Sequence, residues 1–257
     1  MIAVLSPAKT FNEKPQQYSL NTTTPDYLND SQKLVTKLKK QSIKGLEGLM
    51  SVNRKIAQLN KQRYENWTLP FTEENAKPAA YLFRGEVYIG LDTASMTTDE
   101  MAFAQKNLRI LSGMYGLLRP MDLIQPYRLE MGTQLKINRK KNLYEFWGDQ
   151  LAEQLNKEVK SHRYKVIVNL ASEQYVQSVQ TKALTLPLIT PTFKEDRNGV
   201  LKSIHVYAKR ARGLMARYII NNRIENPEDM KSFDVDRYEF SPEHSNDNEW
   251  TFVRLKA

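Results

Sequence analysis

The chain has 257 residues, of which 40% are hydrophobic and 26% are charged, a balance typical of a folded globular protein rather than a disordered one. Its formal net charge of +9 favours a polyanionic partner such as nucleic acid. The absence of cysteine excludes disulfides, thiolate catalysis and cysteine-ligated metals. No stretch approaches the roughly 18 consecutive apolar residues of a membrane span, so we expect a cytoplasmic protein without a membrane partner.

The histidines give no sign of a metal site. Only His162, His205 and His244 are present, and none has the His-Glu-x-x-His or Glu-x-x-His spacing that places metal ligands on one face of a helix. We therefore expect neither a metal nor another cofactor.

Charge is segregated along the chain. Residues 31–64 hold nine Lys or Arg against the single acid Glu47, residues 202–223 hold six against none, and residues 224–249 carry nine acids and two bases. Lysine often serves solubility alone, but two basic segments in one chain favour a nucleic-acid surface. Because the sequence has no repeat, low-complexity tract or long linker, we expect one domain over residues 1–257.

The first basic segment is predicted to form helices. A strand over residues 1–5 is followed by a polar loop, and Thr24 can cap a helix whose residues 28–38 alternate an apolar stripe with lysines. Gly45 and Gly48 then precede a second basic helical stretch. This pattern predicts a helix-hairpin-helix, in which glycines expose backbone N–H groups to a phosphate. The alternative is two surface helices joined by a glycine turn.

The rest of the chain predicts a mixed sheet wrapped by helices, an α/β fold. Thr97 with Glu100 and Asn142 with Glu145 have the spacing of helix caps, and Asn198-Gly199 predicts a hairpin turn. Strands are predicted at residues 81–83, 87–91, 108–111, 165–170, 186–193, 200–207, 233–240 and 250–255.

The second basic segment is predicted to be a helix with one cationic face. At 100° per residue, apolar side chains such as Met215 gather opposite Lys209, Arg210, Arg212, Arg217 and Arg223. A face rich in arginine suits phosphate contacts, which supply most sequence-independent affinity for DNA. The alternative is a solvated helix face.

Three predicted strands end in loops that could form a ligand crevice. The loops cover residues 6–10, 112–116 and 169–175, and crevices in open α/β sheets lie at the carboxyl ends of strands. If the three strands are neighbours, one cleft would contain Lys9, Tyr115, Asn169, Ser172 and Glu173. Taken singly, each residue also suits a turn or a helix cap.

Residues 117–132 are predicted to form a rigid extended loop, because they contain two prolines and alternating polar side chains. Tyr127 could stack on a base, and Arg128 could bind a phosphate. Equally, Arg128 with Glu130 and Arg119 with Asp122 could form pairs that fix the loop.

At this point the motifs resemble those of the YaaA family of peroxide-stress proteins, nearly from end to end. The resemblance is carried by residues 6–10, 83–91, 111–120, 125–132, 169–173 and 207–215. It implies a compact α/β fold peculiar to the family, with a positively charged cleft, a helix-hairpin-helix and binding of duplex DNA. It also implies a role in surviving hydrogen peroxide by keeping unincorporated iron low.

These observations predict a DNA-binding protein of the peroxide response. Its expected nucleic-acid contacts are Lys9, Arg84, Tyr115, Arg119, Tyr127, Arg128, Lys209, Arg210, Arg212 and Arg217. One alternative is an enzyme that acts on a DNA base or nucleotide, with Glu173 as acid or base and Asn169 and Ser172 as hydrogen-bonding partners. Direct iron sequestration is a third hypothesis, which would need scattered carboxylates as ligands.

Overall fold

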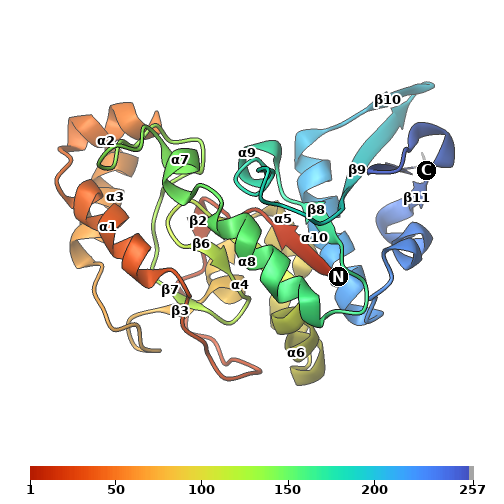
Figure 1. Ribbon diagram of the computed structural model, residues 1–257, viewed down its shortest axis with the longest axis horizontal. Coiled ribbons are helices and arrows are strands. Elements are labelled where there is room, and N and C mark those ends of the chain that lie inside the picture. Colours follow the sequence, from red (N-terminus) through yellow and green to blue (C-terminus); the bar gives the residue numbers. More distant parts are fainter. Residues whose placement is uncertain (255–257) are drawn as a thin grey trace.

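A mixed eight-stranded sheet forms the centre of the computed structural model, which describes residues 1–254 (Figure 1). The strand order is β11-β12-β9-β8-β1-β5-β6, and β10 pairs with β9 outside that path. The strands are β1 (Ile2–Leu5), β5 (Leu108–Ser112), β6 (Gly116–Leu118), β8 (Ile167–Leu170), β9 (Leu188–Arg197), β10 (Val200–Lys202), β11 (Tyr238–Phe240) and β12 (Glu249–Arg254). Two small antiparallel sheets pair β2 (Thr10–Phe11) with β4 (Phe83–Arg84) and β3 (Lys77–Pro78) with β7 (Leu123–Ile124).

The middle of the sheet is parallel and buried. β1 pairs in parallel with both β5 and β8, and β8 and β12 each pair in parallel with β9. Every residue of β1, β5 and β8 is buried, as expected of parallel strands that are covered on both faces.

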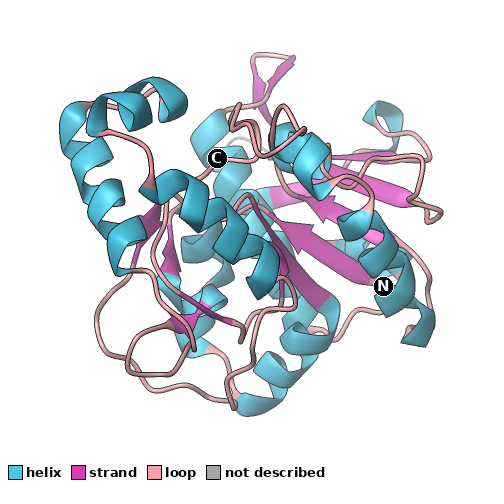
Figure 2. Ribbon diagram, turned by 60° about the vertical axis from the view of Figure 1, so that its left-hand side comes forward, coloured by secondary structure: helices cyan, strands magenta, loops and turns pink. Residues whose placement is uncertain are grey.

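Helices lie on both sides of the sheet (Figure 2). In Figure 1, α8 crosses in front of the sheet and α10 lies behind it. The helices are α1 (Leu28–Lys39), α2 (Ile43–Met50), α3 (Arg54–Asn66), α4 (Ala79–Leu82), α5 (Glu86–Leu91), α6 (Thr98–Asn107), α7 (Leu143–Trp147), α8 (Gln150–Glu158), α9 (Glu173–Val176) and α10 (His205–Asn221). Short 3-10 turns cover Thr93–Ser95, Val159–Ser161, Pro227–Ser232, Val235–Arg237 and Pro242–His244.

Two of the three predicted helix caps are confirmed, but Thr24 does not cap α1, which begins at Leu28 after Tyr27 and has no side-chain cap. Thr97 and Glu100 form a complete capping box at the start of α6, and the Asn142 side chain accepts a hydrogen bond from the backbone N–H of Glu145 at the start of α7. The structure adds caps by Ser42 on α2 and Asn53 on α3.

Glycines allow α5 and α10 to pack against each other without side chains between them. A Cβ on Gly213 would overlap the carbonyl oxygen of Val87, and a Cβ on Gly90 would overlap the carbonyl oxygen of Arg210. The backbones of the two helices therefore lie in contact, which fixes the backbone position of the residues that flank Gly213.

The predicted mixed α/β fold is confirmed, but two of the predicted strands are wrong. Residues 81–83 and 87–91 lie mainly in α4 and α5, because a short apolar run suits a buried helix as well as a strand. The strand predicted at residues 200–207 ends at Lys202, and the one at 233–240 begins only at Tyr238. The hairpin at Asn198-Gly199 is confirmed between β9 and β10. Within residues 1–254, no helix is both long and apolar enough to span a membrane.

Candidate functional site

A cleft of about 610 Å³ opens at the carboxyl ends of the parallel strands. Because β8, β1 and β5 are neighbours in that order and run in parallel, the loops that follow them emerge at one edge of the sheet, as predicted. The cleft is lined by the loops after β1 and β8, by the region around the start of α5 and by the first turns of α10; its polar lining includes Ser6, Lys9, Arg84, Glu86, Glu130, Ser172, Glu173, His205, Lys209 and Arg212.

Two of the three predicted loops form the cleft, and they are joined to each other. The backbone N–H of Ser172 donates to Ser6 Oγ at 2.8 Å, and the Tyr88 hydroxyl donates to the carbonyl oxygen of Ser6 at 3.0 Å. Asn169 lies beneath the loop, where its Oδ1 accepts from the backbone N–H of Ala171 at 2.9 Å. Asn169 therefore shapes the loop and does not line the cleft.

The third loop, after β5, lies in the core. Tyr115 and Tyr127 are buried, the Tyr115 hydroxyl donates to the carbonyl oxygen of Gln125 at 3.0 Å, and the Tyr127 and Ser112 hydroxyls are 2.6 Å apart. Burial raises the pKa of both tyrosines. The predictions that Tyr127 stacks on a base and that Tyr115 contacts nucleic acid are corrected, since neither ring is accessible.

The cleft is mixed in charge, whereas the family resemblance implied a positively charged one. Four cations and three carboxylates line it, and Lys9 Nζ lies 2.8 Å from a carboxylate oxygen of Glu130. Glu86 and Glu130 were not among the residues predicted from the sequence. Only the spatial approach of α5 and of residues 125–132 to the ends of the strands places these carboxylates in the cleft.

Arg212 differs from the other cations of the cleft. It is partly buried, and desolvation lowers its pKa. Among the hydrogen bonds and ion pairs of residues 1–254, none involves the Arg212 side chain. Lys209 lies one turn earlier on α10 and also lines the cleft. A desolvated, unpaired guanidinium that faces a cleft is suited to bind an anion.

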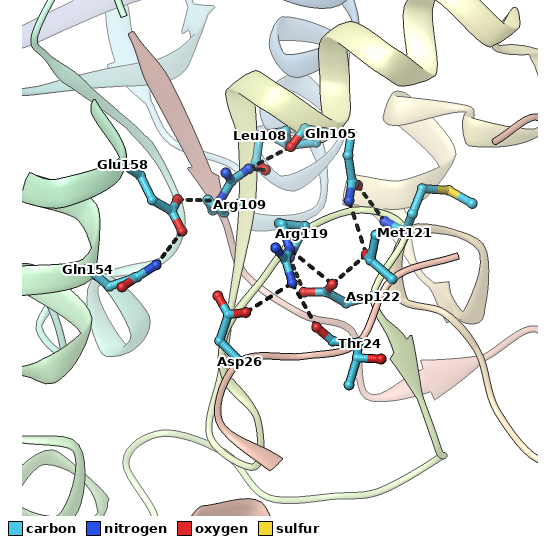
Figure 3. A network of polar contacts seen from close by, with 11 residues as sticks. Thr24, Asp26, Gln105, Leu108, Arg109, Arg119, Met121, Asp122, Gln154 and Glu158 are labelled. Carbon is cyan, nitrogen blue, oxygen red and sulfur yellow. Dashed lines mark hydrogen bonds and ion pairs between the residues drawn. The ribbon is translucent and has the colours of Figure 1, made fainter. Parts of the chain in front are cut away.

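Several predicted DNA contacts are engaged within the protein. Arg119 contacts Asp26 and Asp122 at 3.1 Å each, in the network of Figure 3, and Arg128 Nη2 lies 3.3 Å from Glu130. The alternative in which these pairs fix the loop is therefore the arrangement that the structure contains. Arg128 Nε is buried and has no hydrogen-bond partner among the described residues.

The expected single cationic face of α10 is also corrected. Arg217 donates to the carbonyl oxygen of Asp92 at 2.8 Å and lies 3.7 Å from Glu100. Arg210 is exposed outside the cleft, whereas Arg212 lies inside it. The helix packs on more than one side, so its cations do not share one face: they lie in internal contacts, on the exposed surface or in the cleft.

The first three helices form a separate cationic unit at one end of the molecule (Figure 1). Gly45 and Gly48 lie inside α2, and the turn between α2 and α3 consists of residues 51–53. The glycines therefore do not shape a phosphate-binding hairpin as predicted. The unit instead presents five exposed cations that have no ion pair among the described residues: Lys37, Lys40, Lys44, Arg54 and Lys55.

The cationic unit lies next to the cleft. A second hollow of about 350 Å³ is lined by Ser51 in the turn after α2, and it shares Lys9, Glu130 and Gln174 with the cleft. The two hollows are thus contiguous along the protein surface.

Within residues 1–254, no group of three or more His, Asp or Glu side chains is placed to hold a metal ion.

The fold and these two regions define a class of protein: an α/β protein with a cleft at the carboxyl ends of its parallel strands and a cationic helical unit beside that cleft. The family model described as peroxide stress protein YaaA matches residues 1–244. Similar proteins named UPF0246 occur in Neisseria meningitidis serogroup A (49% identity over 254 residues, 99% of this chain and 98% of the relative) and Idiomarina loihiensis (47% over 256 residues, 100% and 99%). A UPF0246 protein of Hahella chejuensis is 46% identical over 254 residues, 99% of each chain. The chain belongs to the peroxide stress protein YaaA family, as its motifs predicted.

Proposed function

We propose that this chain is a DNA-binding protein of the response to hydrogen peroxide, where it limits oxidative damage and unincorporated iron. The observation that carries the proposal is the set of five exposed cations of α1, α2, α3 and the turn after α1 that have no ion pair among the described residues. Membership of a peroxide stress family supports the physiological setting. The proposal assigns no residue to iron and places the effect on iron downstream of DNA binding.

The cationic unit has the properties of a phosphate-binding surface. Arg54 and Lys55 are exposed in the first turn of α3, and Lys44 is exposed in the first turn of α2. Because these side chains have no carboxylate partner among residues 1–254, a phosphate need not displace one to reach them. Lys61 and Arg63 on α3 already contact Glu65 and Glu13, and they contribute less.

The position of the unit supports a second contact. Since its α2–α3 turn borders the hollow that is contiguous with the cleft, a duplex lying across the turn would pass the mouth of the cleft. Arg84, which is exposed there, could then contact the same backbone.

The proposal is tested by fluorescence anisotropy of a labelled duplex across a salt series. Replacing Lys44, Arg54 and Lys55 with Gln should weaken binding and reduce the slope of log K against log salt by about 0.9 for each phosphate that the variant no longer neutralises. The matched control replaces Lys160, Arg163 and Lys165 with Gln, which are exposed just before β8, at the opposite end of the parallel strands. Equal effects of the two triple variants, or no binding at low salt, would overturn the proposal.

A further inference from the structure

We infer that the cleft binds a single nucleotide through its phosphate, which Arg212 and Lys209 hold, and that in DNA this nucleotide is an unpaired one. The inference rests on the proposed function, since it names the part of DNA that enters the cleft. It goes beyond that function because an open cationic surface needs no unpaired nucleotide.

Size is the first argument. The cleft holds about 610 Å³, within the range of roughly 300–1,000 Å³ that is typical of small-molecule sites. Such a volume can accept a base, a sugar and a phosphate, but not a double helix. Only a nucleotide that has left the base stack, or a free mononucleotide, can therefore reach Arg212 inside it.

The mixture of charges is the second argument. A plain polyanion would meet the carboxylates of Glu86 and Glu173 as well as Arg212, and like charges repel. A nucleotide has both polarities, because its phosphate is anionic while its base carries N–H donors. The cleft offers an unpaired guanidinium for the phosphate, and carboxylates that can accept hydrogen bonds from a base.

The third argument is that the backbone that carries Lys209 and Arg212 is held in place before any ligand arrives. Arg212 directly precedes Gly213, at which the backbone of α10 touches that of α5. On the opposite wall, Ser6 joins the loop after β1 to that after β8 through the bond from the Ser172 N–H at 2.8 Å. A preformed site of this kind loses little conformational freedom when a ligand binds.

The test compares two labelled DNAs that differ by one nucleotide, an intact duplex and the same duplex with a single-nucleotide bulge, at one salt concentration. The wild type should bind the bulged DNA about ten-fold more tightly. Arg212→Gln should abolish this preference while leaving affinity for the intact duplex within about two-fold. In calorimetry, deoxyadenosine 5′-monophosphate should bind the wild type, whereas deoxyadenosine, which lacks the phosphate, should not.

The controls distinguish a failure of the nucleotide site in the cleft from a failure of the proposed DNA binding. The Lys160, Arg163 and Lys165 triple variant should keep the ten-fold preference, and Lys209→Gln provides a second variant if Arg212→Gln fails to fold. Equal affinity for the two DNAs together with no binding of the monophosphate would overturn the inference and leave the proposed function standing. Binding of the monophosphate without any DNA binding would overturn the proposed function and support the nucleotide site.

Discussion

Two groups of arginines in this molecule have opposite surroundings. In Figure 3, Arg109 and Arg119 lie within a network of carboxylates and backbone carbonyl oxygens: Arg109 Nε is 2.6 Å from Glu158, and Arg119 Nη2 donates to the carbonyl oxygen of Thr24 at 2.7 Å. Arg212 on α10 lines a cleft and has no such partner among the described residues. In the sequence, Arg109, Arg119 and Arg212 are the same type of cation. Of these three, the fold leaves only Arg212 available to a ligand.

Net charge counts every charged side chain, whereas a ligand binds most readily to a charged side chain that has no ion-pair partner within the protein. The paired arginines join separate elements, since Arg109 connects β5 to α8 and Arg119 connects the loop after β6 to the segment before α1. Removing one of them should change stability. Removing Arg212 should change binding, because its positive charge is desolvated and has no ion-pair partner among the described residues.

The largest expected effect is on the packing that supports the cleft wall. Gly213→Ala places a methyl group against the carbonyl oxygen of Val87, so α5 and α10 must separate, and the free energy of unfolding should fall by about 3 kcal/mol or more. Urea denaturation followed by circular dichroism measures this. Gly48→Ala is the matched control: its Cβ meets nothing within 4 Å in helix α2, and it should stabilise by about 0.5–1 kcal/mol.

Arg119→Gln should have the next largest effect. Asp122 is 1% exposed and would lose its cation, although Thr23 Oγ1 still donates to it at 2.6 Å. We expect a loss of about 2 kcal/mol at neutral pH in the same denaturation experiment. A loss below about 0.5 kcal/mol would show that the network of Figure 3 does not support the fold.

The pH dependence sharpens that prediction. Burial raises the pKa of Asp122, against the opposing effects of the Thr23 hydrogen bond and the Arg119 charge. Because the folded-state pKa is raised, stability is lost as pH rises from the ordinary Asp range, about pH 4, to that higher pKa, and this loss is absent below the ordinary range. Without Arg119 the pKa rises further, so the deficit of Arg119→Gln relative to the wild type should shrink between pH 7 and pH 4. If Arg119→Gln lost the same free energy of unfolding at pH 7 and at pH 4, the loss could not be assigned to the Asp122 carboxylate.

The smallest expected effect on stability is that of Arg212→Gln. Because this side chain forms no ion pair among residues 1–254 and is already desolvated, its replacement should change the free energy of unfolding by less than about 0.5 kcal/mol in either direction. Thermal and urea unfolding at pH 7 would measure the change. A loss comparable to that of Arg119→Gln would mean that Arg212 is a structural residue.

The sequence predicted the sheet core and the cleft better than it predicted the site's contents. Residues 1–5, 108–111 and 165–170 are mostly apolar and, apart from Lys165, buried, and such runs mark parallel strands wherever they pair. Their polar loops predicted a crevice, and the order β8-β1-β5 confirms that these strands are neighbours. Residues 87–91 were assigned to a strand because the packing of α5 against α10, through Gly90 and Gly213, is a long-range contact that local pattern does not contain.

The sequence could not predict which side chains are exposed in the cleft. Tyr115 and Tyr127 follow a strand as cleft residues do, but they pack edge to face with ring centroids 5.1 Å apart in the core. Glu86 and Glu130 enter the cleft from segments distant in sequence from the loops after β1 and β8. Whether a cation is paired depends on the fold: the sequence offered Asp122 as a possible partner of Arg119, but it did not show that the pair forms or that Asp26 also contacts Arg119.

The most direct test of the contrast measures stability and binding on the same two variants. For Arg119→Gln and Arg212→Gln, urea unfolding and anisotropy with the bulged duplex would be recorded in one buffer, at a temperature where both are folded. The account predicts that Arg119→Gln is destabilised yet keeps its affinity, and that Arg212→Gln keeps its stability yet loses about ten-fold in affinity. If Arg212→Gln binds the bulged duplex as tightly as the wild type, the unpaired cation of the cleft is not a nucleic-acid contact.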